Sequence, residues 1–275
     1  MAEVKTSVSN TGNASGKSGN TMMVNMIIVA GCIALAHILF YTVFRSESNF
    51  LDGATRHKAK NLFGTMYQGG WVVPILISTF FIMLCFVVER FLTIFKSRGK
   101  VSNAEFIKKV QYHLSTKNID AALAECDKQS GSVGNVMKAG LKKYKEMTTS
   151  NMDTDMKVAN IKKEIEESTA LELPMLEKNL VFLSTITSAA TLLGLFGTVM
   201  GMIRAFSAMS AAGAPDAGAL AAGISEALVN TLVGILTSAL AIIFYNYFSN
   251  RIDQITYSMD EAGMSIIQEF QSSGK

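Results

Sequence analysis

Two long apolar stretches near the C-terminus constrain the fold of this chain most strongly. They cover residues 180–206 and 224–248. Each is long enough for a helix that crosses the ~30 Å apolar core of a bilayer, which takes about 20 residues. Both nevertheless contain many Ser, Thr and Gly residues, and the second contains Glu226. Because lipid offers such polar groups no partners, we expect them to face protein or water and interpret the pair as the wall of an ion path.

Two further apolar stretches, at 22–44 and 71–95, complete the set. A cleaved signal peptide is the competing interpretation of the first. That stretch is longer than a usual signal-peptide core and no small-x-small cleavage site follows it, which favours a retained transmembrane helix. In the second, Trp71 fits the aromatic belt of a membrane interface, and Pro74 falls in the first turn of the helix. The fold class predicted is an all-α polytopic membrane protein.

The segments around these stretches are polar. Residues 1–21 are rich in Ser, Gly and Asn and are expected to be disordered. Residues 45–70 form a polar connection, and 207–223 form a short connection of small residues. Residues 249–275 keep the apolar spacing of a helix, so we expect this tail to continue the fourth transmembrane helix.

The longest polar segment, 96–179, is predicted to be a helical aqueous segment. Ser102 and Asn118 are candidate N-caps of two of its helices. From about Asp153 the pattern is helical up to the third span, and Pro174 is expected at most to bend it. We therefore expect one long helix that runs from the aqueous segment into the membrane.

The distribution of lysine and arginine around the spans predicts how the chain is oriented in the membrane. Cytoplasmic segments next to a membrane are enriched in these residues. They cluster after the second span at Arg90, Lys96, Arg98 and Lys100, whereas 207–223 contains none. This places 96–179 and the C-terminus in the cytoplasm, and 45–70 and 207–223 outside. Four basic residues weaken the assignment of 45–70, namely Arg45, Arg56, Lys58 and Lys60.

Composition argues against several other classes of protein. The formal charge of +3 is too small to favour nucleic-acid binding. Cys32, Cys85 and Cys126 include no CxxC pair, so they predict neither a disulfide framework nor a zinc site. No nucleophile–base arrangement stands out, so neither an enzyme nor a cofactor is expected. His37 lies in the first apolar stretch, where a bond to a neighbouring backbone or hydroxyl group is expected. Glu89 and Arg90 are expected to pair with each other or to reach the interface.

Polar residues follow one face of each of the last two spans. On the third span they are Ser184, Thr187, Ser188, Thr191 and Thr198, beside a glycine strip at 194, 197 and 201. Close helix packing alone would explain most of that run, because small residues let membrane helices approach. On the fourth span Glu226, Asn230 and Thr237 share one side, and Thr231, Gly234 and Ser238 share an adjoining one.

Glu226 is the hardest of these residues to explain by packing. A carboxylate near the bilayer centre costs about 2.5–3.5 kcal/mol on insertion scales. Glu226 falls in the first turn of its predicted span, where interfacial depth and the positive end of the helix dipole both favour a negative charge. A tolerated interfacial glutamate and a functional carboxylate therefore both stay open.

Three motifs point to a family. GLFGTVMG (194–201), GISEALVNTLVG (223–234) and YNYF (245–248) resemble the MotA/TolQ/ExbB proton channel superfamily, with ExbB as the nearest member. The resemblance runs from Trp71 to the C-terminus. The chain differs from the usual pattern in its extra N-terminal span, in Asn230, where Ala or Thr is usual, and near Leu240, where a proline is usual.

The resemblance implies a pentamer in the bacterial inner membrane, with three ExbB/TolQ-like transmembrane helices per chain plus the extra N-terminal one. Two single-span ExbD-like chains would sit in a central pore, and one would present the aspartate that carries the proton. The implied pore residues are Thr198, Glu226 and Thr231, joined by Asn230, Thr191, Thr187 and Ser238. Glu226 would tune the local field, while the threonine hydroxyls can donate and accept.

The function that this resemblance implies is a proton-channel or motor subunit. Together with an ExbD-like partner and a TonB-like protein, it would use the proton motive force to energise transport across the outer membrane. A TolQ-like subunit that maintains outer-membrane integrity is one alternative. A non-conducting membrane scaffold is another, and the short tail disfavours a flagellar-stator-like task.

Overall fold

The fold is helical throughout the part of the chain that the computed structural model describes, which is residues 14–52, 59–211 and 217–273. No strand occurs among these residues, and Phe50 and Ala59 form an isolated bridge. Within them, four helical stretches are long and apolar enough to cross a membrane: Met23–Phe44, Val72–Ser97, Thr154–Ser210 and Ala217–Ser272. The predicted class, an all-α polytopic membrane protein, is confirmed.

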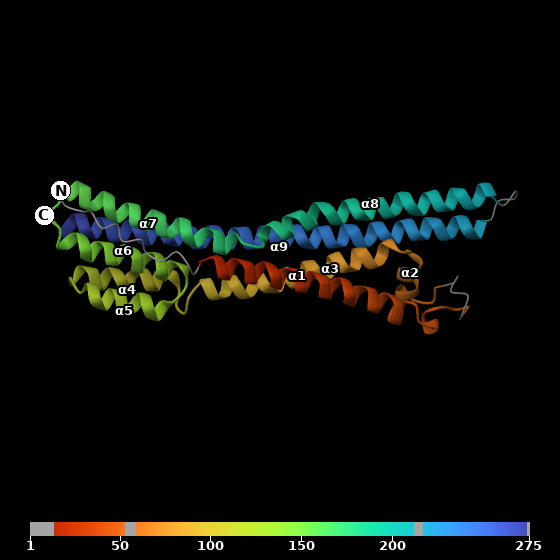
Figure 1. The fold of residues 1–275 in the computed structure, drawn as a ribbon, viewed down its shortest axis with the longest axis horizontal. Coiled ribbons are helices and arrows are strands. Elements are labelled where there is room, and N and C mark those ends of the chain that lie inside the picture. Colours follow the sequence, from red (N-terminus) through yellow and green to blue (C-terminus); the bar gives the residue numbers. More distant parts are fainter. Residues whose placement is uncertain (1–13, 53–58, 212–216, 274–275) are drawn as a thin grey trace, which may run out of the picture. The chain divides into compact units, whose positions relative to one another are not determined.

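The helices follow one another with short connections (Figure 1). They are α1 (Ala14–Leu39), a π-helix η1 (Phe40–Phe44), a 3₁₀ turn η2 (Glu47–Asn49), α2 (Leu62–Gln68), α3 (Val72–Ser97), α4 (Asn103–Ser115), α5 (Ile119–Gln129), α6 (Ser132–Thr148), α7 (Thr154–Glu177), α8 (Leu180–Ala211) and α9 (Ala217–Ser273). The chain divides into two compact units. Unit 1 contains 1–85 and 186–239, and unit 2 contains 86–185 and 240–275. Each unit is described by itself.

The start of the chain differs from the expectation of disorder over 1–21. Residues 1–13 lie outside the described part, and α1 begins at Ala14, ahead of the apolar stretch. Once an apolar helix has formed, each added residue gains a backbone hydrogen bond, so a helix can extend back through polar residues.

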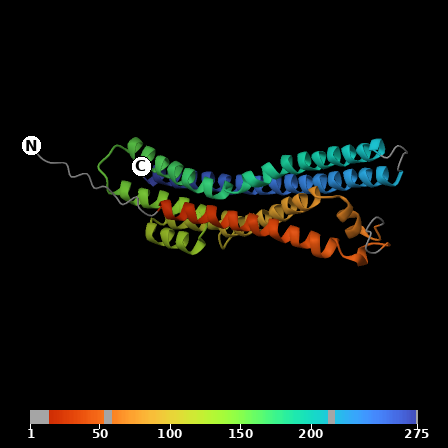
Figure 2. The ribbon, with the colours of Figure 1, turned by 45° about the vertical axis from the view of Figure 1, so that its right-hand side comes forward.

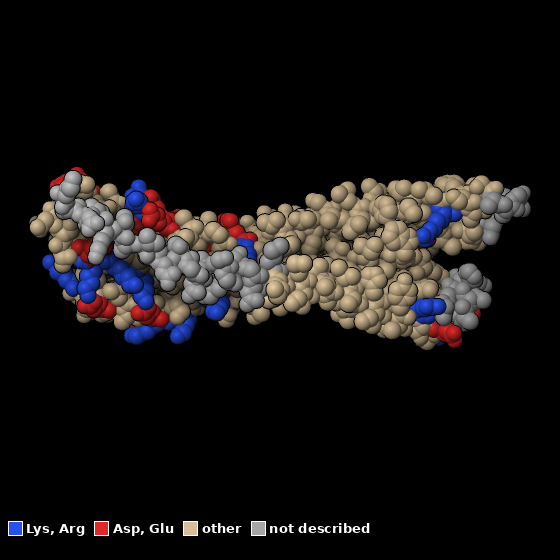
Figure 3. All heavy atoms as spheres, in the orientation of Figure 1, with Lys and Arg blue, Asp and Glu red and all other residues tan. Residues whose placement is uncertain are grey.

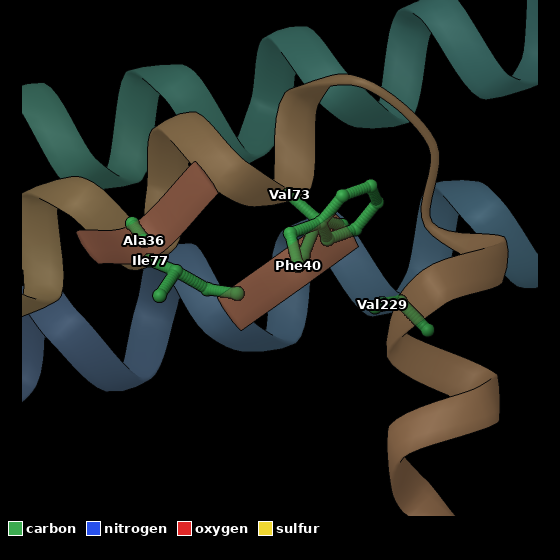
Figure 4. Close-up of a cluster of buried hydrophobic side chains, with 5 residues drawn as sticks. All are labelled: Ala36, Phe40, Val73, Ile77 and Val229. Carbon is green, nitrogen blue, oxygen red and sulfur yellow. The ribbon is translucent and has the colours of Figure 1, made fainter. Parts of the chain in front are cut away.

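The extra N-terminal helix packs inside unit 1. Ala36 of α1 and Phe40 of η1 are buried with Val73 and Ile77 of α3 and with Val229 of α9 (Figure 4). These five side chains form one apolar cluster, so α1 is held by α3 and α9 within this unit.

Two polar groups of α1 have partners that the fold explains. The Sγ atoms of Cys32 and Cys85 lie 3.4 Å apart as free thiols, a proximity that their sequence separation gave no sign of. His37 Nδ1 lies 2.9 Å from the carbonyl oxygen of Ile33, one turn earlier, which is the local backbone bond expected.

Unit 2 holds the charged helices, and Lys, Arg, Asp and Glu gather over α4–α7 (Figure 3). Asn118 accepts a hydrogen bond from the backbone N–H of Ala121 at 3.1 Å, as expected of an N-cap. Ser102 occupies the N-cap position of α4, but its hydroxyl does not bond to the helix. The ring of Tyr144 on α6 meets Phe270 on α9 edge to face at 4.9 Å. Burial raises the pKa of Cys126 to about 12, so this thiol stays protonated at neutral pH.

The prediction of one unbroken helix from Asp153 into the third span is wrong at two residues. Helix α7 ends at Glu177 and α8 begins at Leu180. Lys178 adopts an extended ψ of 143° and Asn179 has a positive φ of 62°. Pro174 lacks an N–H, so the last turn of α7 is missing one backbone bond, and a helix that is already weakened ends soon after.

An arginine stabilises this break. The Arg90 side chain is 1% exposed, and its Nη1 donates to the carbonyl oxygen of Leu176 at 2.8 Å. Its Nε and Nη2 donate to the two Glu89 carboxylate oxygens at 2.7 and 2.6 Å. The expected pairing of these two residues is therefore found, but Arg90 is buried rather than extended towards an interface.

Helix α9 is continuous from Ala217 to Ser273. The tail therefore continues the fourth span as a helix, as its apolar spacing predicted. Buried apolar residues recur along it at Ile252, Ile255, Met259, Ile266 and Phe270.

Candidate functional site

Helices α8 and α9 approach closely in unit 1 because glycines line their contact. They lie side by side in both ribbon views (Figures 1 and 2). A Cβ atom built on Gly194 would lie 3.1 Å from the Cα atom of Gly234, and one built on Gly201 would lie 2.8 Å from the backbone nitrogen of Ala227. The glycine strip therefore sets the distance between these two spans, as the packing interpretation predicted.

Thr198 and Thr231 meet at this contact. Their hydroxyl groups are hydrogen-bonded to each other, and both residues are half-buried. Thr198 can also donate to the carbonyl oxygen of Gly194 at 3.1 Å, and Thr231 to that of Ala227 at 3.2 Å. Because each hydroxyl can donate or accept, the pair can reverse the direction of its hydrogen bond without losing a partner.

A second hydroxyl contact lies further along the same two helices. Ser238 donates to the backbone carbonyl oxygen of Thr187 at 2.6 Å, and Thr191 donates to the same oxygen at 3.3 Å. Thr191 and the neighbouring Ser188 are exposed. The hydroxyl of Thr191 is satisfied within its own helix, so this exposed residue is compatible with lipid as well as with a polar neighbour.

Glu226 forms an ion pair with Arg204 that the sequence pattern did not predict. Arg204 Nη1 donates to Glu226 Oε1 at 2.6 Å. The Glu226 side chain is 10% exposed, whereas that of Arg204 is 45% exposed. Gly70 lies against this pair with a φ of 74°, and a Cβ atom there would lie 3.2 Å from Arg204 Nη1. The sequence feature that could have predicted this ion pair is Arg204 itself, the single arginine in the third span.

The placement of Glu226 in the first turn of its helix is wrong. Helix α9 begins at Ala217, so Glu226 lies more than two turns from its start. The helix dipole acts within about the first turn and offers this carboxylate little. The guanidinium of Arg204 compensates the charge instead.

Asn230 bonds to a group outside the hydroxyl pair. The residue is fully buried, and its Nδ2 donates to the carbonyl oxygen of Gly69 at 3.0 Å. Its Oδ1 is buried without a hydrogen-bond partner among the described residues. Within a single chain Asn230 therefore links α9 to the turn between α2 and α3, and its pore-lining role remains a prediction.

The two partners of this ion pair differ in burial, so their replacement should lower the stability of the protein by different amounts. We expect Arg204→Gln to destabilise the protein by about 1–3 kcal/mol, because it leaves a nearly buried carboxylate without its partner. Glu226→Gln should cost less than about 1 kcal/mol, since Arg204 can turn to water. The measurement is unfolding in mixed micelles with increasing sodium dodecyl sulfate, followed by circular dichroism.

The double variant Arg204→Gln/Glu226→Gln completes a double-mutant cycle with the two single variants and serves as its internal control. It should be more stable than Arg204→Gln alone, because no charge is then left unpaired. If the two single variants lost equal stability, or if the stability loss of the double variant equalled the sum of theirs, the ion pair would not stabilise Glu226.

The fold and these contacts define a class of protein: a multi-pass helical membrane protein with polar groups between two of its spans. A model of the MotA/TolQ/ExbB proton channel family matches residues 128–261, which include all seven predicted pore residues. Over this stretch, which is about half of its length, the chain is similar to that family.

Several curated relatives are similar to the chain. A putative biopolymer transport protein ExbB-like 3 from Synechocystis is 40% identical over 86 residues, which are 30% of this chain and 41% of the relative. The Tol-Pal system protein TolQ of Pseudomonas aeruginosa is 31% identical over 130 residues, or 47% and 56% of the two chains. A putative ExbB homologue from Methanothermobacter thermautotrophicus is 26% identical over 201 residues, or 70% and 66%. The chain thus spans about half the length of the first two.

Proposed function

We propose that the chain is a proton-channel subunit that works with an ExbD-like partner. It would use the proton motive force to energise a TonB-like protein for transport across the outer membrane. The observation that supports this most directly is the hydroxyl pair of Thr198 and Thr231, held between two membrane-spanning helices. The match of residues 128–261 to the family model and the similarity to relatives named ExbB support the proposal.

The proposed path runs along the polar sides of α8 and α9. Thr198 and Thr231 orient water and pass a proton, and Thr187, Thr191 and Ser238 extend the polar surface. Glu226 tunes the field beside Arg204, and Asn230 contributes once the assembly forms. The proton acceptor is an aspartate on the partner, so this chain alone is expected to conduct poorly.

The proposed assembly is a pentamer in the bacterial inner membrane around two copies of the partner. Residues 96–179 and the C-terminus lie in the cytoplasm, and 45–70 and 207–223 lie on the periplasmic side. The assignment follows the lysines and arginines near the ends of the spans. No catalytic, cofactor or metal role is proposed for any residue.

Proton flux tests the function. The chain and its ExbD-like partner are reconstituted in vesicles that contain a pH-sensitive dye, and a proton gradient is imposed. Thr198→Val and Thr231→Val should each lower the flux, and the double variant should lose most of it, because valine keeps the volume but removes the hydroxyl group. Glu226→Gln should lower the flux less, since Glu226 does not carry the proton in this scheme.

Thr79→Val is the matched control. Thr79 lies in the α3 span and donates only to its own helix, at the carbonyl oxygen of Ile75 3.0 Å away. This variant should conduct like the wild type. A double threonine variant that assembles normally and still conducts at the wild-type rate would favour the non-conducting scaffold.

A TolQ-like role is the second candidate, because relatives named TolQ match the chain as well as relatives named ExbB do. Complementation separates the two roles. Restored growth on an iron–siderophore complex in a strain without ExbB and TolQ supports TonB coupling. Restored resistance to detergent without restored siderophore uptake supports the TolQ-like role.

A further inference from the structure

Unit 2 contains a cavity of about 360 Å³ that the proposed proton path does not use. Its walls come from the end of α3, the connection into α4, the first turn of α4 and the 247–258 part of α9. All of these segments belong to unit 2, so the whole cavity lies within one compact unit.

One side of the cavity is aromatic. Phe91, Phe95 and Tyr247 line it with 43%, 79% and 42% of their surfaces exposed. The Phe91 ring packs edge to face on the buried ring of Phe248, with 4.9 Å between the ring centroids, and this contact holds Phe91 in place at the bottom of the cavity. Tyrosine is enriched where a membrane meets water, so Tyr247 fits that level, and the two exposed phenylalanine rings offer an apolar surface beside it.

The other side of the cavity is cationic. It is lined by Arg98 and Arg251, and no Asp or Glu is among the described residues that line it. Arg251 donates to the side chain of Gln254 at 2.9 Å and lies over the Tyr247 ring at 5.3 Å. Neither arginine forms an ion pair with the described part of the chain. Two guanidinium groups without a carboxylate favour an anionic ligand, and the planar guanidinium suits phosphate.

The cavity lies where the sequence changes from apolar to basic. The apolar part of α3 ends close to Ser97, and that of α9 ends near Phe248, three residues before Arg251. The first turn of α4 contributes Asn103 and Ala104 to the cavity wall. This turn is polar because backbone N–H groups at the start of a helix have no partner within the helix. An occupant must therefore combine an anionic head with an apolar tail.

We propose that this cavity binds the headgroup of an anionic phospholipid. The phosphate would lie between Arg98 and Arg251, and an acyl chain would lie along Phe91, Phe95 and Tyr247. A second copy of the chain is a poorer occupant, since it would have to place a carboxylate or a phosphate-like group between two arginines. Zwitterionic lipid lacks the net charge that the two guanidinium groups favour.

The test measures lipid binding to the full chain in detergent micelles by native mass spectrometry. Dioleoylphosphatidylglycerol is titrated against dioleoylphosphatidylcholine and against glycerol phosphate, which has the head but no tail. Arg98→Gln/Arg251→Gln should weaken phosphatidylglycerol binding roughly 30-fold, because each basic residue near an anionic lipid contributes about five-fold. Phe95→Ala should weaken phosphatidylglycerol binding and leave glycerol phosphate unaffected.

Lys96→Gln/Lys100→Gln is the matched control, because it removes the same charge from the same segment at residues that do not line the cavity. This control should keep phosphatidylglycerol binding close to wild type. Equal weakening by the two double variants would show nonspecific attraction and overturn the proposal. Equal binding of phosphatidylcholine, glycerol phosphate that competes as well as the lipid, or a cavity closed by a second copy in the assembled protein would also overturn it.

Discussion

Replacing Arg90 with methionine is expected to destabilise the protein by about 2–3 kcal/mol, because a buried charged donor is lost and its acceptors are left without it. The guanidinium is 1% exposed and donates three hydrogen bonds, two to Glu89 and one to the carbonyl oxygen of Leu176. Methionine has a similar length but donates none of them. The last turn of α7 would lose the donor that covers its carbonyl group, at the point where Pro174 has already removed a backbone bond.

Unfolding in mixed micelles, followed by circular dichroism, measures this effect. Lys100→Met is the control, because it makes a similar change at an exposed residue close in the chain. The double variant Glu89→Leu/Arg90→Met should recover part of the loss, since it leaves no carboxylate unpaired. An Arg90→Met protein as stable as the Lys100→Met control would show that the break between α7 and α8 does not depend on this arginine.

Replacing Gly234 with valine is expected to separate α8 from α9 and to cost at least about 2 kcal/mol, as overpacking of a close contact does. A Cβ atom on Gly234 would lie 2.7 Å from the carbonyl oxygen of Ala190 and 2.8 Å from the Cα atom of Gly194. Both are backbone atoms, so no side chain can move aside to relieve the clash. The hydrogen bond between Thr198 and Thr231 lies in the same contact and should be lost as well.

The same micelle titration measures the stability loss, and proton flux with the partner measures the loss of the threonine contact. Gly31→Val is the control, because a Cβ atom on Gly31 would meet nothing within 4 Å although this glycine also lies in a membrane-spanning helix. Gly31→Val should leave both quantities unchanged. If Gly234→Val also left both unchanged, the close approach of the two helices would not be needed for the site.

The candidate site could be predicted from sequence only where neighbours on a helix carry the information. The periodicity of Ser, Thr and Gly placed Thr198 and Thr231 on the polar sides of their helices, but it did not predict that their hydroxyl groups contact each other. It could not identify the partner of Glu226, because Arg204 lies 22 residues away on the preceding span. Periodicity could not identify the partner of the Asn230 amide either, because Gly69 lies 161 residues away.

The sequence by itself determined the number of apolar helices, the glycine strip and the local cap at Asn118. These features depend on residues a few positions apart, which a helix brings together wherever it is placed. Only the tertiary structure decided which charges pair, where α7 breaks from α8 and what surrounds Arg90, whose carbonyl partner is 86 residues away. Such contacts depend on the packing of several helices, and helical periodicity reports a face of a helix but not the group that will lie against it.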